Sequence, residues 1–174
     1  SRIHPLASKL LPDIGAANQT GLLNNLIFNV PFSFNGYSYD GRVDHVFGSN
    51  TRGFAKFNYS DYEVVSRAAL GDRIGDGTIS TPYTLTAILN LSHNFSPTLL
   101  AEFRGGYNRY YTNVNGLDLT SVTNQSLGVV NPNPDAISSQ GMARFNISGR
   151  MPGIGTPVVY PLTNGENLFN FVNT

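Results

Sequence analysis

Histidines and closely spaced charges are the side chains of this sequence best suited to chemistry. His4, His45 and His93 lie far apart along the chain, whereas a metal site needs ligands that converge on one ion. Glu102 and Arg104 stand two positions apart, which places both on one face of a strand, where we expect them to form a ladder of charges and not to perform acid–base chemistry. No serine occupies a nucleophile elbow, and the sequence has no cysteine. We therefore expect no catalytic residues, no metal site and no cofactor.

The glycine-rich segment 71–78, GDRIGDGT, has the composition of an ion-binding or phosphate-binding loop. It lacks the D-x-[DN]-x-[DN]-G spacing and the distal glutamate of a calcium loop. No Lys-Ser/Thr pair follows it, as would be needed in a phosphate loop. We interpret it as an external loop between two strands.

The charge balance of the chain argues against a nucleic-acid partner. The 174 residues include 11 Lys+Arg and 11 Asp+Glu, so the formal net charge is +0. A protein that holds a phosphate backbone needs a basic field, so we expect no nucleic acid among the partners. Abundant Asn, 18 Gly and 10 Pro indicate turns, and 9 Tyr with 11 Phe favour strands. No apolar run of about twenty residues, as a membrane-spanning helix would need, is present.

Four segments alternate apolar and polar side chains, which is the pattern of β-strands. They cover 37–47, 53–62, 83–95 and 99–111, and each is close to the roughly ten residues that a tilted strand needs to cross a bilayer. One face is apolar and is expected to face lipid; it carries Val43, Phe57, Leu85, Leu89, Leu91, Ala101 and Phe103. The other face is polar and is expected to line a wet lumen; it carries Asp40, Arg42, Asp44, Lys56, Asn58, Asn90, Glu102, Arg104 and Asn108.

The connections between these segments alternate in length. Those at 48–52 and 96–98 are short, and those at about 63–81 and 112–165 are long. Consecutive hairpins alternate ends, so all short turns lie on one side of the sheet, as in outer-membrane barrels. Aromatic residues gather at both ends of the strands like the girdles of such barrels, and they are Tyr37, Tyr39, Phe47, Phe54, Tyr59, Tyr62, Tyr83, Phe95, Tyr107 and Tyr110. These features favour a transmembrane barrel over a half-buried soluble sheet.

The first hairpin also predicts an ion pair across two strands. If its paired positions sum to 100, both faces stay in phase and Asp44 lies opposite Lys56. We expect this pair on the polar face.

Two longer stretches carry a resemblance to a known family. The segments YSYDGRVDHVFGSNTRGFAKFNYSD and ILNLSHNFSPTLLAEFRGGYNRY resemble the barrel of TonB-dependent outer-membrane receptors, in the subgroup with an N-terminal carboxypeptidase-regulatory-like domain. The opening stretch RIHPLASKLLPDIGAANQTGLLNN is similar to the segment that precedes such a strand in that subgroup. Membership would imply a bacterial outer-membrane barrel of about 22 strands that is filled by a plug.

The resemblance also implies a function. Such receptors use energy relayed by TonB to import a bulky, scarce ligand such as a siderophore or a glycan. The expected partners are outer-membrane lipid, the plug of the same full-length chain, TonB through parts outside this sequence, and an imported ligand that the sequence does not name. We expect a transport protein and not an enzyme.

The predicted fold class is all-β, an antiparallel transmembrane barrel segment of about four meandering strands with long external loops. We expect a connecting segment at 1–36 with a short helix near Ile3–Leu11, four strands within 37–111, an external loop at 112–165, and the start of a further strand at 166–174. This describes an internal fragment of a larger barrel. Two alternatives stay open: a small complete barrel of about eight strands, and a secreted β-sandwich adhesin or carbohydrate-binding module.

Overall fold

The computed structural model describes residues 3–22, 25–118, 123–129, 141–146, 153–157 and 159–174. Its elements, in chain order, are α1 (Pro5–Ile14), β1 (Phe32–Val46), β2 (Thr51–Ser66), β3 (Thr78–Ser80), β4 (Tyr83–Ser96), β5 (Leu99–Gly116), α2 (Thr123–Leu127) and β6 (Leu162–Asn173). The predicted all-β antiparallel class is therefore confirmed. Within the described ranges, no helix has both the length and the apolar character needed to cross a bilayer.

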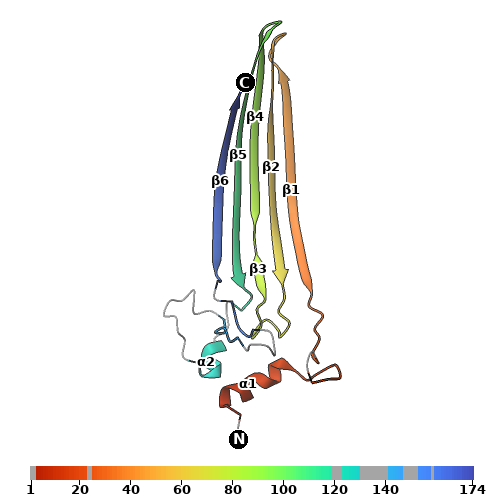
Figure 1. The fold of residues 1–174 in the computed structure, drawn as a ribbon, viewed down its shortest axis with the longest axis vertical. Coiled ribbons are helices and arrows are strands. Elements are labelled where there is room, and N and C mark those ends of the chain that lie inside the picture. The colour runs from red at the N-terminus through yellow and green to blue at the C-terminus, as the bar shows by residue number, and fades with distance from the viewer. Residues whose placement is uncertain (1–2, 23–24, 119–122, 130–140, 147–152, 158) are drawn as a thin grey trace. The chain divides into compact units, whose positions relative to one another are not determined.

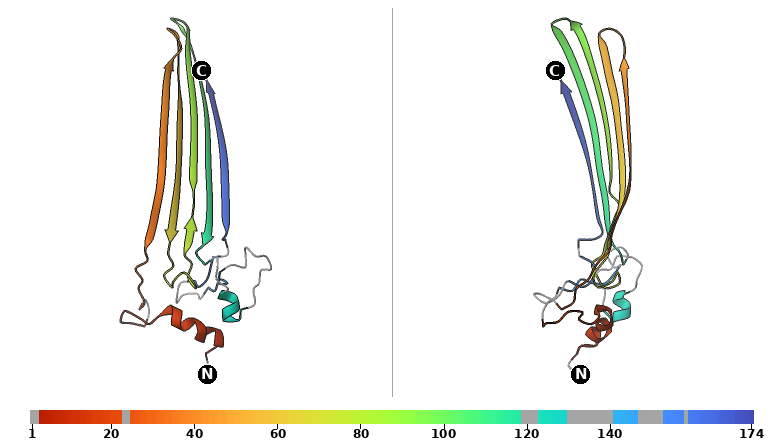
Figure 2. Two further views of the ribbon diagram at one scale, coloured as in Figure 1. Left: turned by 180° about the vertical axis from the view of Figure 1, so that it is seen from behind. Right: turned by 90° about the vertical axis from the view of Figure 1, so that its right-hand side faces the viewer.

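The strands form one six-stranded sheet in which long neighbours lie side by side (Figure 1). β1 pairs with β2, β2 with β4, β4 with β5, and β5 with β6. The short strand β3 precedes β4 in the chain and also lies between β2 and β5. The two further views in Figure 2 show the long strands as a single open layer. Each strand follows its neighbour through a hairpin or a longer connection, which is a meander.

The register keeps side chains of the same kind on the same face. Thr51 lies opposite His93 and Asp61 opposite Tyr83 in the β2–β4 pair, without a shift between them. The β4–β5 pair is equally regular from Tyr83 to Asn94, and a bulge follows at Ser96. Because strand side chains alternate between faces, the odd-numbered residues share one face and the even-numbered residues the other.

Four strands extend beyond the sequence pattern by more than one residue. β1 begins at Phe32 and not at 37, β2 spans Thr51–Ser66 and not 53–62, β5 continues to Gly116 and not only to 111, and β6 begins at Leu162 and not at 166. β3 explains the extension of β5, because Thr78 and Ser80 pair with Gly116 and Val114. The sequence pattern places 78–80 in a loop, since three residues are too few to show alternation.

The N-terminal helix also differs from its predicted bounds. The sequence pattern ends it before Pro12, but α1 continues through Pro12 to Ile14. Gly15 follows with a φ of 79°, a left-handed conformation that glycine adopts without steric cost. His4 caps the other end, where its Nδ1 accepts a hydrogen bond of 3.2 Å from the Leu6 amide. One proline in the last turns is tolerated here, and the glycine ends the helix.

The chain divides into two compact units, a strand unit of Asn35–Glu63, Thr81–Asn113 and Thr163–Thr174, and a loop unit of Ser1–Phe34, Val64–Ser80 and Val114–Leu162. The loop unit has a hydrophobic core of its own, formed by Leu10, Leu70, Ile74, Leu127, Met142 and Ile154. These residues come from α1, from both long connections and from α2. The long connections are therefore folded against the N-terminal helix, at least in their described residues.

Polar contacts reinforce this core. The buried Asn124 side chain donates to the Gly141 carbonyl at 2.9 Å and accepts from the Ala143 amide at 2.7 Å. Lys9 donates to the Leu127 carbonyl at 3.3 Å, and Arg73 forms an ion pair with Asp13. Each contact joins segments that are distant in the sequence, so the loop unit behaves as a small folded body.

Removing a core side chain should open the loop unit. Ile74 is completely buried, and Ile74→Ala should cost about 2 to 5 kcal/mol of local stability because a cavity replaces three carbon atoms. The rate of protease cleavage in the full-length folded protein measures this, and it should rise in segments 64–80 and 114–162. Leu22→Ala is the control, since that side chain is 98% exposed. Equal cleavage rates for the two variants would contradict the packed loop unit.

Candidate functional site

The strand unit presents two faces of opposite character, and these faces are its candidate functional surfaces. We call the face of odd-numbered residues in β1, β2, β4, β5 and β6 the apolar face, and the face of even-numbered residues the polar face. The strand registers and side-chain contacts place every predicted lumen residue on the polar face and every predicted lipid residue on the apolar face.

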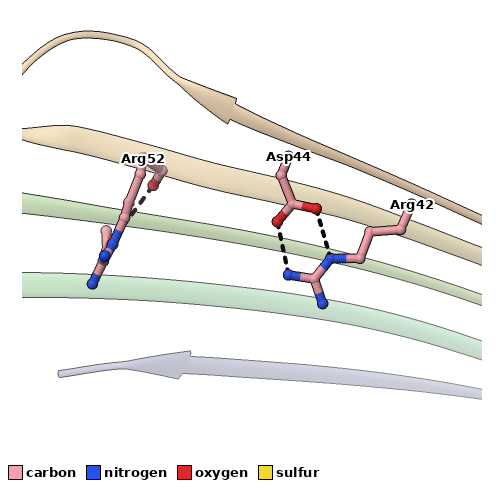
Figure 3. Close-up of polar contacts among 4 residues, drawn as sticks. Arg42, Asp44 and Arg52 are labelled. Atoms are coloured by element: carbon pink, nitrogen blue, oxygen red, sulfur yellow. Dashed lines mark hydrogen bonds and ion pairs between the residues drawn. The ribbon is translucent and has the colours of Figure 1, made fainter.

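The first hairpin carries a charged pair on the polar face. Arg42 donates from Nε and Nη2 to both carboxylate oxygens of Asp44, at 2.8 Å and 2.7 Å (Figure 3). Both residues belong to β1, two positions apart. The guanidinium also lies over the Phe54 ring, with Cζ 4.1 Å from the centroid. The Arg42 side chain is thereby held between an anion and an aromatic face.

The predicted pair between Asp44 and Lys56 is not present, because Asp44 binds Arg42 instead. The hydroxyls of Ser38 and Ser60 lie 2.8 Å apart, and Asn58 donates to Asp40 at 3.0 Å. The residue numbers of paired positions in this hairpin therefore sum to 98 and not to 100. A shift of two residues leaves each side chain on its face but changes its partner. In this register Lys56 lies opposite Arg42.

A second polar network crosses β4 and β5. Asn90 donates to Glu102 Oε1 at 2.6 Å, and Arg104 donates to the same oxygen at 2.9 Å. Asn108 donates to the Thr86 hydroxyl at 2.8 Å on the same face. Asn90 is buried, so its amide depends on Glu102 for a partner. The polar face is thus joined by side-chain hydrogen bonds across neighbouring strands.

Another contact extends this face toward the short turns. Arg52 lies opposite Ser92 and donates to its hydroxyl from Nε at 3.3 Å (Figure 3). A hollow in this part of the face is lined by Arg42, Asp44, Arg52, Asn90 and Glu102 among others. Cations and anions are interleaved within it, which suits contact with water or with a polar protein surface.

The apolar face is exposed across its width. The exposed fractions are 70% for Val43, 46% for Phe57, 54% for Leu89 and 42% for Phe103. A soluble sheet would cover such a face, since contiguous apolar patches of this size are rare on soluble monomers. Leu85, Leu91 and Ala101 lie on the same face.

Aromatic residues border the apolar face at both ends, with one correction to the prediction. Tyr37, Tyr39, Tyr59, Tyr83 and Tyr107 lie toward the long connections, and Phe47 and Phe95 toward the short turns. The other three predicted girdle residues, Phe54, Tyr62 and Tyr110, have even numbers and lie on the polar face; Phe54 contacts Arg42, and Tyr110 lies opposite Thr84. Clustering near a strand end groups them with the girdle, although alternation assigns them to the other face.

The spacing of the two borders fits a bilayer. In the β4–β5 register His93 lies opposite Ala101 and Tyr83 opposite Tyr111, so ten residues of β5 separate the two rows. At about 3.3 Å per residue this is roughly 33 Å along the strand, or about 23 Å across a membrane at a tilt near 45°. Transmembrane barrels have an apolar band of about 25 Å between their girdles.

The two histidines of the strand unit each pack against an aromatic ring of the same chain segment. His45 packs edge-on against Phe47, with centroids 4.5 Å apart, and His93 packs in the same way against Phe95 at 4.4 Å. His93 also shares a hydrogen bond of 2.6 Å with the Thr51 hydroxyl. No group of three or more His, Cys, Asp or Glu residues that could hold a metal occurs among the described residues.

Two parts of the apolar face lie outside the set predicted from the sequence. Phe169 and Phe171 extend it onto β6, and the Phe169 ring lies 4.9 Å from that of Tyr107. Arg109 also lies on this face, where it donates to the Tyr83 hydroxyl at 2.8 Å. All three residues have odd numbers, and the odd-numbered residues of β5 lie on the apolar face. Alternation could therefore have assigned these three residues to the same face from the sequence.

Comparison with protein families identifies the class of protein to which the chain belongs. A family model described as an outer membrane beta barrel domain matches residues 1–174. The chain belongs to this family. Membership places the protein in the bacterial outer membrane and agrees with the two-faced antiparallel sheet. Searches of curated proteins and of solved structures gave no match.

Placing a second carboxylate in the polar network should weaken the barrel wall. Asn90→Asp would set a new carboxylate against that of Glu102 and remove the amide hydrogen bond of 2.6 Å, and we expect a loss of about 1 to 3 kcal/mol in unfolding free energy. Urea unfolding of the full-length protein in detergent measures it. Asn108→Asp is the matched control, because the Thr86 hydroxyl can donate to the new carboxylate. Equal losses in both variants would show that the Asn90–Glu102 contact does not stabilise the sheet.

Proposed function

We propose that this chain supplies part of the barrel wall of a TonB-dependent transporter, which imports a bulky, scarce ligand across the outer membrane. The observation that carries the proposal is the pairing of an exposed apolar face with a charged, hydrogen-bonded polar face on the same long strands. Family membership supports the barrel. The resemblance of two long stretches of the sequence to TonB-dependent receptors supports the transport function.

The polar face suits a wide and wet lumen. Small barrels fill their interior with side chains, whereas wide barrels enclose water or a plug. Arg42 and Asp44 keep 53% and 61% of their side chains exposed even though they are paired, and Arg104 keeps 57%. Charges of this kind need water or polar partners. In the proposal the plug of the full-length chain provides those partners on the inner side of the wall.

Both edges of the sheet also fit a larger barrel. β1 and β6 each pair with a single neighbour among the described strands. Lipid offers no hydrogen bonds to a strand edge, so each edge needs another strand in the membrane. Further strands of the same full-length barrel meet this need.

The loop unit is the proposed surface for ligand contact. Both long connections leave the strand unit from the end opposite the short turns, as external loops do in outer-membrane barrels. Packing against α1 gives their described residues fixed positions, and pre-ordered loops lose less entropy when they bind. TonB would act through parts of the protein outside this sequence. The proposed activity is transport, without a catalytic step.

Shortening the long connection and charging the lipid face should have opposite effects. Deleting Gly128–Gly155 should abolish ligand uptake while barrel insertion survives, because this segment contributes no residue of the strand unit. Phe103→Arg should instead hinder insertion, since a cation near the bilayer midplane costs roughly 2 to 4 kcal/mol. Surface exposure and uptake by cells that express the full-length variants measure the two effects.

Phe103→Leu is the control for insertion, because it keeps the face apolar. If the deletion variant takes up ligand normally, the loop unit does not recognise the ligand. The assignment of the strands to a barrel would not be affected. Normal insertion of the Arg variant would contradict the lipid-facing position of Phe103.

A further inference from the structure

Arg109 is a charged residue on the apolar face of the sheet. It has the only guanidinium or ammonium group on that face among the described residues of β1, β2, β4, β5 and β6. Its neighbours on β5, Tyr107 and Tyr111, are aromatic, and Leu85 lies opposite it on β4. A cation that faces lipid requires a specific partner or a position near the membrane surface.

The contacts of Arg109 orient its guanidinium without neutralising it. Nε donates to the Tyr83 hydroxyl at 2.8 Å, and Nη1 donates to Asn167 Oδ1 at 3.0 Å. Tyr107 donates to the same Asn167 oxygen at 2.8 Å. The acceptors are a phenol and an amide, both uncharged, and no carboxylate of a described residue forms an ion pair with Arg109. The positive charge is therefore held in place but not balanced.

Aromatic rings on β2, β4, β5 and β6 line this part of the apolar face. Tyr83 stacks on Tyr111 with centroids 5.2 Å apart and lies 6.1 Å from Tyr59. Tyr107 packs against Phe169 on β6. The acidic residues of this face, Asp61 and Glu63, lie on β2 and are separated from β5 by β4. The β4–β6 part of the face thus combines a positive charge with flat rings and amide and phenol groups.

Arg109 also lies at the depth where lipid headgroups begin. It is two residues from Tyr111, in the tyrosine border next to the long connections. In outer-membrane barrels the end with long loops is external. The depth of Arg109 rests on two parts of the proposed function, namely that the apolar face contacts lipid and that the long connections are external.

We propose that Arg109, Tyr83, Tyr107 and Asn167 form a binding site for the phosphate of a phosphorylated glycolipid in the outer leaflet. The guanidinium provides charge and a planar set of donors for phosphate oxygens. The tyrosine rings provide flat, amphipathic surfaces that suit sugar rings and the upper acyl chains. The site holds one lipid against the wall on the β4–β6 side of the barrel.

The test uses the full-length protein, purified in a non-ionic detergent that carries no phosphate. Diphosphorylated lipid A and the same glycolipid without phosphates are added in turn, and native mass spectrometry measures bound lipid. The parent should prefer the phosphorylated form, and Arg109→Gln should weaken its binding about tenfold, which is the usual effect of losing a charged hydrogen bond. Tyr83→Phe should produce a smaller loss, since it removes the hydroxyl that orients Nε.

Arg104→Gln is the matched control, because Arg104 lies on the same strand but on the polar face. Unchanged lipid binding by the control and loss in Arg109→Gln support the site. Equal binding by the parent and Arg109→Gln, or equal loss in both arginine variants, would overturn it. Displacement of the lipid by millimolar inorganic phosphate would show a simple anion site and would overturn the lipid assignment.

The proposed function fails in a different way. If the variants and the parent do not insert into outer membranes, or if the apolar face is accessible to water, the membrane position itself is wrong. A parent that inserts normally but shows no preference for the phosphorylated glycolipid would refute the Arg109 site alone.

Discussion

Backbone hydrogen bonding is the constraint on which the rest of the strand unit depends. Hydrocarbon provides no donors or acceptors, so every amide and carbonyl at membrane depth must find its partner in a neighbouring strand. The unbroken β2–β4 register from Thr51 to Asp61 and the β4–β5 register from Tyr83 to Asn94 meet this need. Regular pairing also fixes which side chains share a face. The apolar surface around Leu89 and the polar network at Glu102 are both consequences of that one pairing.

The same constraint explains which features of the strands can be read from the sequence. Alternation has a period of two, so the residues of each face, such as Val43 and Arg42, can be assigned without knowledge of strand partners. The partners themselves need the register. The hairpin of β1 and β2 is shifted by two residues from the expected pairing, which leaves the faces unchanged and moves Asp44 from Lys56 to Arg42. The face of each strand residue could be read from the sequence. The register could not, because it is set by the turn and by contacts such as that between Ser38 and Ser60.

The loop unit could not be predicted in the same way. Ile74 and Met142 have no periodic neighbours, and their burial depends on contacts between α1, the 67–77 connection and the segments after β5. Such a core is built from single residues that are distant in the sequence. Composition indicated long loops, but only the three-dimensional structure shows that their described parts pack together. The described parts of the long connections thus form one folded body with α1.

The central claim is that the two faces of the sheet meet different media, and cysteine accessibility tests it directly. Single cysteines would replace Val43, Phe57, Leu91 and Phe103 on the apolar face, and Arg42, Lys56 and Arg104 on the polar face, in the full-length protein in membranes. A small water-soluble maleimide should label the second set and leave the first set largely unmodified, because lipid excludes the reagent. Ready labelling of the first set with protection of the second would contradict the assignment of lipid and lumen to these faces.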